Sequence, residues 1–393
     1  MKKIAKLLGV LALALLIGFS MAGCNGESPD NSNNPFELQP FDDITAAELV
    51  ANIKIGWNLG NTFDAYNLNW LGNNPTVAQL ERGWVNHTTT QSNINTIKAG
   101  GFNTIRIPVS WHKVCDTNFN IRTDWMARIT EVVNYAVTND MYIILNTHHD
   151  EDIFKFRDVD MPNSLKAFNK IWEQIAENFM NYNEKLIFEG LNEPRTKGTP
   201  AEWNGGTEEE RNNLNIYYQN FVDTVRATGG NNDKRFLMIN TYGASAGANA
   251  VNGLVLPNDT AENKLIVSVH FYEPYNFALN TNASFNTWSQ SNSQDTGAII
   301  ERVNRVNTAF VSKGIPVIIG EFGAMNKNNE DIRAVWAEFY VKTAKDKGIP
   351  CIWWDNGGTT GSGELFGLLN RSNNTFHYPK VLDGLMRGAG VTN

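Results

Sequence analysis

Acidic, basic and imidazole side chains gather at or near the ends of short apolar runs in this chain. Glu193 stands in Glu-Gly-Leu-Asn-Glu-Pro after one such run, and Glu321 stands in Gly-Glu-Phe-Gly after another. Three of the six histidines occupy similar positions, and Arg106 lies within a third run. Carboxyl groups and imidazoles donate and accept protons, and a carboxylate can also attack as a nucleophile. These positions are therefore candidates for acid–base or nucleophilic chemistry.

Eight apolar runs carry these groups, and each is predicted to be a strand. They span residues 53–58, 104–109, 141–146, 186–189, 235–240, 265–269, 316–319 and 350–354. Their apolar character is nearly continuous, as expected for strands covered on both faces. Helical patterns fall between most of them, at residues 91–99, 124–138, 164–180, 208–227, 298–312 and 331–345. Glycines follow several of these helical segments, as they follow helix C-termini.

This alternation of strands and helices predicts βα units. Eight such units over residues 41–390 suit one α/β domain, a (β/α)8 TIM barrel with extended βα loops. Catalytic groups of such a barrel project from the carboxyl ends of its strands, which is where the candidate residues stand. No second linker follows residue 41, so we expect a single domain.

Composition narrows the classes of function. The chain has 393 residues and a net charge of −8, and it lacks a Lys/Arg cluster, so we expect no nucleic-acid partner. No spacing of cysteine and histidine resembles a zinc site, and we expect no metal or cofactor. The 11 tryptophans fit either a large core or platforms in a ligand cleft. Cys115 and Cys351 are expected to be unpaired thiols, with a disulfide between them as the alternative.

The N-terminus is predicted to be a signal peptide over residues 1–23, with a basic start and an apolar segment too short to span a bilayer. Met-Ala-Gly-Cys at 21–24 resembles a bacterial lipoprotein processing site, which makes Cys24 the lipidated residue; plain signal cleavage is the alternative. Residues 24–40 read as a flexible tether to the domain at 41–390. We expect an exported protein, either secreted or a lipoprotein of the outer membrane or cell surface whose only membrane contact is this anchor.

Taken together, the strand-end motifs resemble those of glycoside hydrolase family 5, whose members are β-glycanases built on the (β/α)8 barrel. Asn192-Glu193-Pro194 is the most telling motif, followed by Glu321 in its Gly-Glu-Phe-Gly setting. Their order along the chain, with His270, Tyr272 and Arg106, makes the combination specific. Gly-Trp-Asn-Leu-Gly-Asn-Thr at 56–62 and Glu-Trp-Asn-Gly-Gly at 202–206 further resemble subfamily 4, which acts on cellulose-type glucans, mixed-linkage β-glucan and xyloglucan.

The resemblance implies a retaining endo-β-1,4-glucanase that works by double displacement, with Glu193 as the acid/base and Glu321 as the nucleophile. We expect burial and the charge of Glu321 to raise the pKa of Glu193. Arg106 should keep Glu321 ionised, and Tyr272 should donate a hydrogen bond to it. The two carboxyl groups are predicted to lie about 5–5.5 Å apart.

The resemblance also implies residues that bind the substrate or support the catalytic pair. Asn192 would bind the 2-hydroxyl of the sugar beside the cleaved bond, Trp354 would stack against that ring, and Asn61 would bind hydroxyls there. His148 and His149 would contact sugar hydroxyls or support Glu193, and His270 would orient or tune it. Several residues have competing interpretations. His149 could instead be a structural histidine, Trp203 could line a distal subsite or be only a lid residue, and Trp57 could belong to the core or have a distal or supporting role. Trp353 is expected to pack between the barrel and the helices, and Glu189 to be an internal structural carboxylate.

Three other functions stay open at this point. The same barrel could serve a β-mannanase or a xylanase. A metal-dependent hydrolase is suggested by His148-His149-Asp150, but it would need further converging ligands. A glycan-binding protein without catalysis is the most distant alternative. The partner expected in the first case is a β-glucan polysaccharide, bound by a monomer.

Overall fold

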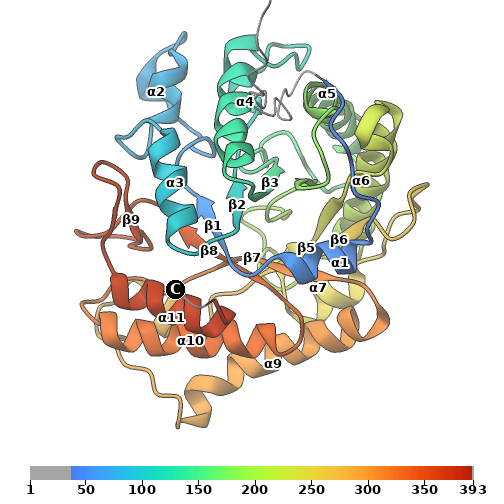
Figure 1. Cartoon of the computed structure of the whole chain (residues 1–393). Helices are drawn as coiled ribbons and strands as arrows, with labels where there is room; N and C mark the ends of the chain where they lie inside the picture. Colours follow the sequence, from blue (N-terminus) through green and yellow to red (C-terminus); the bar gives the residue numbers. More distant parts are fainter. Residues whose placement is uncertain (1–36, 392–393) are drawn as a thin grey trace, which may run out of the picture. The chain divides into compact units, whose positions relative to one another are not determined.

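The computed structural model describes residues 37–391 (Figure 1). Eight parallel strands form a closed barrel in which each strand is hydrogen-bonded to the next along the chain, and the last pairs with the first. They are β1 (Gly56–Leu59), β2 (Thr104–Ile107), β3 (Tyr142–Asn146), β4 (Leu186–Glu189), β5 (Leu237–Ser245), β6 (Leu265–His270), β7 (Val317–Phe322) and β8 (Cys351–Asp355). The predicted (β/α)8 barrel is therefore confirmed.

A helix follows each strand. These helices are α3 (Gln91–Ala99), α4 (Thr123–Thr138), α5 (Met161–Phe179), α6 (Glu208–Ala227), α7 (Ala248–Gly253), α9 (Ser293–Ala309), α10 (Glu330–Lys345) and α11 (Pro379–Ala389). The six predicted helices are present, and α9 begins earlier than expected because the Asn292 side chain caps the amide of Gln294. The sequence analysis missed α7, which has only six residues, and α11, which lies beyond the last strand.

Smaller elements lie in the loops, and those that follow β1, β2, β6 and β8 confirm the prediction of extended βα loops. These elements are η1 (Asn69–Leu71) and α2 (Val77–Glu81) after β1, η2 (His112–Val114) after β2, η3 (Gly230–Asp233) before β5, α8 (Tyr275–Ala278) after β6, η4 (Val311–Lys313) before β7, and the hairpin β9 (Leu369–Asn370) and β10 (Thr375–Phe376) after β8.

Alternation along the strands separates two apolar layers. On β4, Leu186 and Phe188 belong to the large cluster that packs against the helices, whereas Ile187 belongs to a cluster inside the barrel. The short helix α1 (Ala46–Asn52) adds Leu49 and Val50 to that inner cluster. Figure 1 draws α1 next to β5 and β6, and the packing of its apolar side chains against the inner cluster closes the amino-terminal end of the barrel. Polar residues therefore gather at the opposite, carboxyl end of the barrel.

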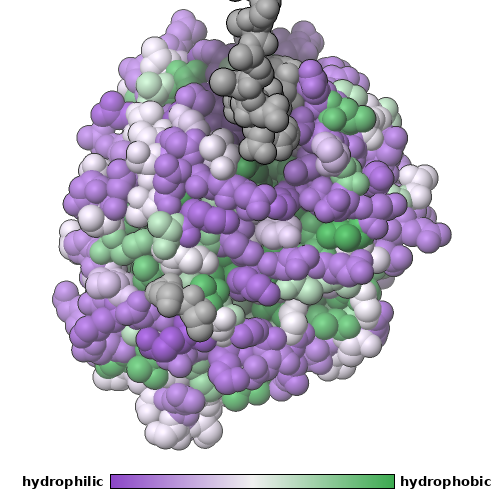
Figure 2. All heavy atoms as spheres, in the orientation of Figure 1, coloured by the Kyte–Doolittle hydropathy of each residue, from purple (hydrophilic) through white to green (hydrophobic). Residues whose placement is uncertain are grey.

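Two of the tryptophans singled out in the sequence belong to the core. Trp57 and Trp353 are fully buried, and the Trp57 Nε1 donates to Asp355 Oδ2 at 2.9 Å. Cys115 is half-buried and Cys351 is buried, and both are unpaired thiols, as predicted. Hydrophilic residues dominate the face seen in Figure 2, and apolar residues form scattered patches on it.

Within residues 37–391, no helix is both long and apolar enough to cross a membrane. The predicted signal peptide, Cys24 and most of the predicted tether lie outside the described residues.

Candidate active site

Arg106 of β2 is the centre of a buried polar network at the carboxyl end of the barrel. Its Nε donates to Glu189 Oε2 at 2.6 Å, and its Nη1 donates to Glu321 Oε1 at 2.7 Å and to Asn58 Oδ1 at 2.9 Å. Its Nη2 donates to Asn192 Oδ1 at 2.7 Å. The guanidinium is fully buried, so these charge-assisted bonds fix the relative positions of four strands.

Glu189 is the buried counterion of this network. It points into the barrel, as predicted, and is fully buried. Besides Arg106 it accepts hydrogen bonds from Asn146 Nδ2 at 3.1 Å and from Asn240 Nδ2 at 2.9 Å. Its oxygens are therefore occupied by protein donors, which suits a structural carboxylate.

Glu193 and Glu321 face each other at the end of the barrel. A carboxylate oxygen of each and a ring nitrogen of His270 all lie within 4.8 Å of one another. The pairing of β6 with β7 shifts register between Val269 and His270, which sets His270 beside Glu321. This carboxylate separation matches the short spacing of retaining glycosidases and not the gap of roughly 6.5–9.5 Å found in inverting ones.

The two carboxylates have different surroundings. Glu321 accepts from Arg106 and also, at 2.9 Å, from the Tyr272 hydroxyl. The Glu193 Oε1 lies 3.1 Å from His270 Nδ1, which is also 3.7 Å from Glu321 Oε2. Burial, followed by the charges of Glu321 and Glu193, raises the pKa of Tyr272 well above its usual value. The phenol therefore remains protonated and can act as a donor to Glu321.

The pKa of Glu193 is lowered in the free protein, so the expected rise is wrong. Burial does raise this pKa, but the hydrogen bond and charge of His270 outweigh it, together with the charges of Arg195 and His149. The Nδ1–H of His270 can donate to Glu193 in the neutral and in the charged ring, whereas the charge contribution requires an imidazolium. The lowered pKa of Glu193 therefore depends on its contact with His270.

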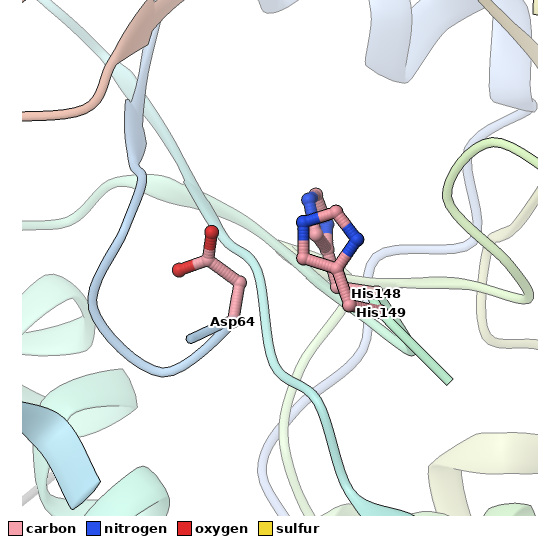
Figure 3. Close-up of side chains that lie close together, drawn as sticks. All are labelled: Asp64, His148 and His149. Atoms are coloured by element: carbon pink, nitrogen blue, oxygen red, sulfur yellow. The ribbon is translucent and has the colours of Figure 1, made fainter. Parts of the chain in front are cut away.

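His148 and His149 lie side by side, with the Asp64 carboxylate facing them, but they have different environments (Figure 3). The His148 ring stacks on Trp354 at 5.8 Å between centroids and 2° between planes, and its Nδ1 lies 3.2 Å from Asn146 Nδ2. Burial lowers the pKa of His148 well below its usual value, so the ring is neutral. His148 and Trp354 together present a flat aromatic surface at the carboxyl end of the barrel.

His149 fits its structural interpretation. Its Nδ1 lies 3.5 Å from Glu151 Oε1, and its ring contacts Tyr66 at 4.6 Å and Trp84 at 5.9 Å. Its hydrogen-bond partner is therefore Glu151 and not Glu193.

Asp64, His148 and His149 form a cluster of possible metal ligands, but the hydrogen bonds of Asp64 give its carboxylate a structural role. One ligand atom from each of Asp64, His148 and His149 lies within 4.8 Å of the others. However, the Asp64 oxygens accept the backbone N–H groups of Asn61 at 3.0 Å and Thr62 at 2.7 Å, and burial raises the Asp64 pKa. A carboxylate used in this way is a poor metal ligand. Its role is to hold Asn61, whose φ is 57°, in the loop after β1.

Asp355 and Arg371 were not assigned a role from the sequence, yet they brace this side of the site. Asp355 Oδ2 accepts from Trp57 Nε1 and from the amides of Leu368 and Leu369. Arg371 donates to Asp355, to the Gly60 carbonyl at 3.1 Å and to Thr62 Oγ1 at 2.8 Å. The pair links β8, which carries Trp354, to the β1 loop that carries Asn61. Only the strand-end position of Asp355 signalled this role in the sequence.

A second network missed by the sequence analysis surrounds the outer side of Glu193. Arg195 Nη1 lies 3.6 Å from Glu193 Oε2 and donates to the Glu193 carbonyl at 2.8 Å. The Arg195 Nε donates to Glu202 at 3.1 Å, and its guanidinium lies 4.4 Å from the ring of Trp203. Trp203 is 59% exposed, so this loop presents an aromatic surface next to Glu193.

Glu151 joins this network to the loop after β3, and it supports a pH-dependent prediction. Burial raises the pKa of Glu151, but the hydrogen bond and charge of His149 and the charges of Lys197 and Arg195 lower it by more, so that it falls to about 2. A depressed carboxyl pKa contributes stability that is complete above pH 4.5 and is lost as the pH falls toward 2. We expect Glu151→Gln to lower the free energy of unfolding by roughly 1–3 kcal/mol at pH 7 and by progressively less from pH 4.5 to 3.

Urea unfolding of both proteins across that pH range measures the difference. A loss of stability that stays constant from pH 7 to pH 3 would contradict the ion-pair explanation. Glu173→Gln is the control, because Glu173 pairs with Lys170 on an exposed helical surface and should have little effect at any pH.

Comparisons with known proteins agree with this geometry. The family model "Cellulase (glycosyl hydrolase family 5)" matches residues 62–360. Endoglucanase B of Neocallimastix patriciarum is 47% identical over 88% of this chain and 72% of its own length. Endoglucanase A of Clostridium longisporum is 43% identical over 91% of this chain and 68% of its own length.

Solved structures give the same result. A GH5-4 broad specificity endoglucanase from Ruminococcus champanellensis with bound cellotriose has a TM-score of 0.84 at 49% identity, covering 88% of this chain and 99% of that one. A lichenase from Caldicellulosiruptor sp. F32 has a TM-score of 0.84 at 41% identity, covering 90% and 98%. The chain therefore belongs to glycosyl hydrolase family 5, the cellulase family.

Proposed function

We propose that this chain is a retaining endo-β-1,4-glucanase in which Glu193 is the acid/base and Glu321 is the nucleophile. The observation that carries this assignment is the asymmetric carboxylate pair. Arg106 and Tyr272 donate to Glu321, which suits an ionised nucleophile, whereas the Glu193 carboxylate lies against His270 and Arg195. The substrates proposed are cellulose-type glucan, mixed-linkage β-glucan and xyloglucan.

The reaction proceeds in two displacements. Glu321 attacks the anomeric carbon while Glu193 protonates the departing glycosidic oxygen, which yields a glycosyl ester on Glu321 and a free chain end. The ester has no charge, so Glu193 then ionises readily and takes a proton from a water that attacks the same carbon. Two inversions at one carbon retain the β configuration.

Other residues of the site stabilise the transition state. Arg106 holds the Asn192 Oδ1, so the Asn192 Nδ2 is the group that it can offer to the 2-hydroxyl of the reacting sugar. Trp354 and the stacked His148 provide a flat wall for that ring, with Asn61 on the adjoining loop. A neutral His148 can both accept a hydrogen bond from a sugar hydroxyl and donate one to it.

The choice of substrate rests on the relatives. Their printed names describe endoglucanases, a lichenase and broad specificity, and one structure holds cellotriose. A β-mannanase or xylanase remains the alternative, because the catalytic residues are compatible with all three backbones.

A panel of carboxymethylcellulose, lichenan, xyloglucan, xylan and glucomannan tests this choice. We expect a rapid fall in viscosity of the glucans and new reducing ends that are initially β by proton NMR. Products that begin as the α anomer, or hydrolysis confined to xylan or mannan, would contradict the proposal.

Trp203 offers a test of the direction in which substrate lies. Arg195 contacts both the ring of Trp203 and the carboxylate of Glu193, the proposed acid/base. We therefore infer that Trp203 contacts sugars on the leaving-group side. Loss of an aromatic–sugar contact of about 1.5 kcal/mol should lower kcat/KM of Trp203→Ala on a soluble glucan about 10-fold. Hydrolysis of an aryl cellobioside should be unchanged, because its small leaving group does not reach Trp203. Equal losses on both substrates would contradict this placement.

The cellular location is proposed from the N-terminal sequence alone. We propose export through residues 1–23, with lipidation of Cys24 as the finer proposal, and a monomeric enzyme. Mass spectrometry of the mature N-terminal peptide distinguishes a lipidated Cys24 from plain signal cleavage, and light scattering of the purified protein measures its mass.

A further inference from the structure

Three buried polar atoms lie beneath the catalytic pair without a protein partner among the described residues. They are Asn240 Oδ1 on β5 and, on β6, Ser268 Oγ and His270 Nε2. Asn240 and Ser268 are fully buried, and His270 is 5% exposed. Buried polar groups of folded proteins almost always find a hydrogen-bond partner, so three on adjoining strands point to a common ligand.

Register and alternation place these atoms together. Asn240 is the direct neighbour of Ser268 across the β5–β6 pairing, and Ser268 is next to Ile318 across the β6–β7 pairing. Ile266 belongs to the cluster inside the barrel, so Ser268 and His270, two and four residues further along β6, face the same interior.

Two of these atoms lie close to the backbone of Gly320. A Cβ at residue 320 would lie 2.7 Å from Ser268 Oγ and 2.8 Å from His270 Nε2. Ser268 Oγ and His270 Nε2 therefore approach the same side of the Gly320 backbone without bonding each other, and a side chain at residue 320 would collide with both. The missing side chain belongs to the residue that precedes Glu321.

The orientation of the asparagine restricts what can lie there. Asn240 Nδ2 donates to the Glu189 carboxylate, which can only accept while it is ionised, so the Oδ1 must face away and needs a donor. His270 Nε2 needs a donor when the ring is neutral with its proton on Nδ1, and it needs an acceptor when the ring is an imidazolium. Water and a hydroxyl group can each play both parts.

We propose that Ser268 is a positioning residue that governs the protonation of His270, by means of an internal water molecule held between Ser268 Oγ, His270 Nε2 and Asn240 Oδ1. No covalent step is involved, because the hydroxyl and the water only reorient as His270 gains or loses a proton. The proposal rests on Glu193 being the acid/base, since His270 acts on the reaction through Glu193.

The consequence concerns the charge that faces Glu193. The charged and titratable groups around His270 come from five strands and their loops: Glu193, Arg195, Glu321, Tyr272, Arg106 and His148. Without the Ser268 hydroxyl, the bridging water would lose one of its partners and would be held less firmly as the acceptor of an imidazolium Nε2–H in this buried setting, which disfavours the charged ring. Less positive charge at His270 would then raise the pKa of Glu193, whose lowering depends on that charge.

Ser268→Ala tests the proposal, with Ser268→Thr as the variant that restores a hydroxyl. Ser164→Ala is the matched control, because Ser164 is a buried serine on α5 whose Oγ bonds the amide of Lys155. We expect the alkaline limb of the kcat–pH profile of Ser268→Ala to move up by about half a pH unit or more. Ser268→Thr and Ser164→Ala should keep the profile of the natural enzyme.

A measurement that does not depend on activity separates this proposal from the catalytic assignment. The ¹⁵N spectrum of His270, identified by comparison with a His270 variant, should show a smaller imidazolium fraction in folded Ser268→Ala than in the natural protein at the same pH. Unchanged ¹⁵N signals and an unchanged pH profile would overturn the role of Ser268. If Glu193 were not the acid/base, the ¹⁵N difference would persist without the shift in the pH profile.

A crystal structure tests the water itself. We expect an ordered water within about 3.2 Å of Ser268 Oγ and His270 Nε2 in the natural enzyme. Close packing of protein atoms against both groups, with no water, would overturn the proposed bridge.

Discussion

Glu193→Gln and Glu321→Gln are each expected to lower kcat on a natural β-glucan by at least about 10³-fold, and the two losses should differ in kind. An amide cannot protonate the departing oxygen, and it cannot form the glycosyl ester. The shape of the side chain is kept, so both variants should fold. Initial rates on carboxymethylcellulose, with far-ultraviolet circular dichroism to verify folding, measure the losses. Glu173→Gln, an exposed change on α5, should retain full activity.

An activated substrate separates the two roles. Dinitrophenyl cellobioside needs little help from an acid, so Glu193→Gln should still form the glycosyl ester in a burst and then stall at hydrolysis. Azide, which needs no general base, should speed its turnover and give the β-glycosyl azide. Glu321→Ala removes the nucleophile and leaves room beside the anomeric carbon, so azide should give the α-glycosyl azide there. Exchanged azide products would reverse the assignment of the two glutamates.

Much of the fold could be predicted because its signals are local. The eight strands are short apolar runs, and β4 was placed over the residues that the structure assigns to it. Helices α3 and α6 were also placed correctly, since a Thr capping box begins each and a glycine lies at or just beyond its end. The missed elements depend on tertiary packing instead. Helix α1 is only seven residues long, and it is stabilised by the apolar interior of the barrel.

The sequence predicted which residues meet at the carboxyl end of the barrel, but not the direction in which the pKa of Glu193 shifts. Barrel topology brings strand ends together, so Arg106, Glu193, His270, Tyr272 and Glu321 were expected to meet, and the structure joins them in one network of contacts. The pKa of Glu193 was expected to rise because the sequence shows only that burial and Glu321 are near. It falls through His270 and Arg195, and contacts between such distant positions follow from loop conformation, which has no local signal.

Arg106 should be the residue whose loss harms both folding and catalysis. Arg106→Met would leave the carboxylates of Glu189 and Glu321 without their shared counterion in a buried network. Removing one partner of a buried ion pair typically costs about 3–5 kcal/mol, and we expect a loss of that size in the free energy of unfolding. We also expect kcat to fall at least about 10³-fold, because Glu321 and Asn192 are no longer held in place. Arg106→Lys should be intermediate in stability, since one ammonium cannot bond four side chains at once.

A second buried arginine provides the control for general destabilisation. Arg235 is fully buried near the amino-terminal end of the barrel, and its guanidinium donates to Asn232 and to the carbonyls of Phe179, Tyr182, Asn183 and Leu186. Arg235→Met should also lower stability, yet kcat per folded molecule should stay near that of the natural enzyme. Urea unfolding curves and kcat corrected for the folded fraction measure both quantities. A normal kcat in Arg106→Met would show that the network is structural alone.

The double variant Arg106→Met with Glu189→Gln separates the two consequences of losing the arginine. Glu189→Gln removes one of the buried charges that Arg106→Met leaves unpaired, and a glutamine can still bond Asn146 and Asn240. Part of the lost stability should therefore return, which gives a favourable coupling between the two substitutions of about 1–3 kcal/mol in a double-mutant cycle. Activity should not return, because the nucleophile still lacks its positive partner. Recovery of kcat together with stability would mean that Arg106 acts on catalysis only through the fold.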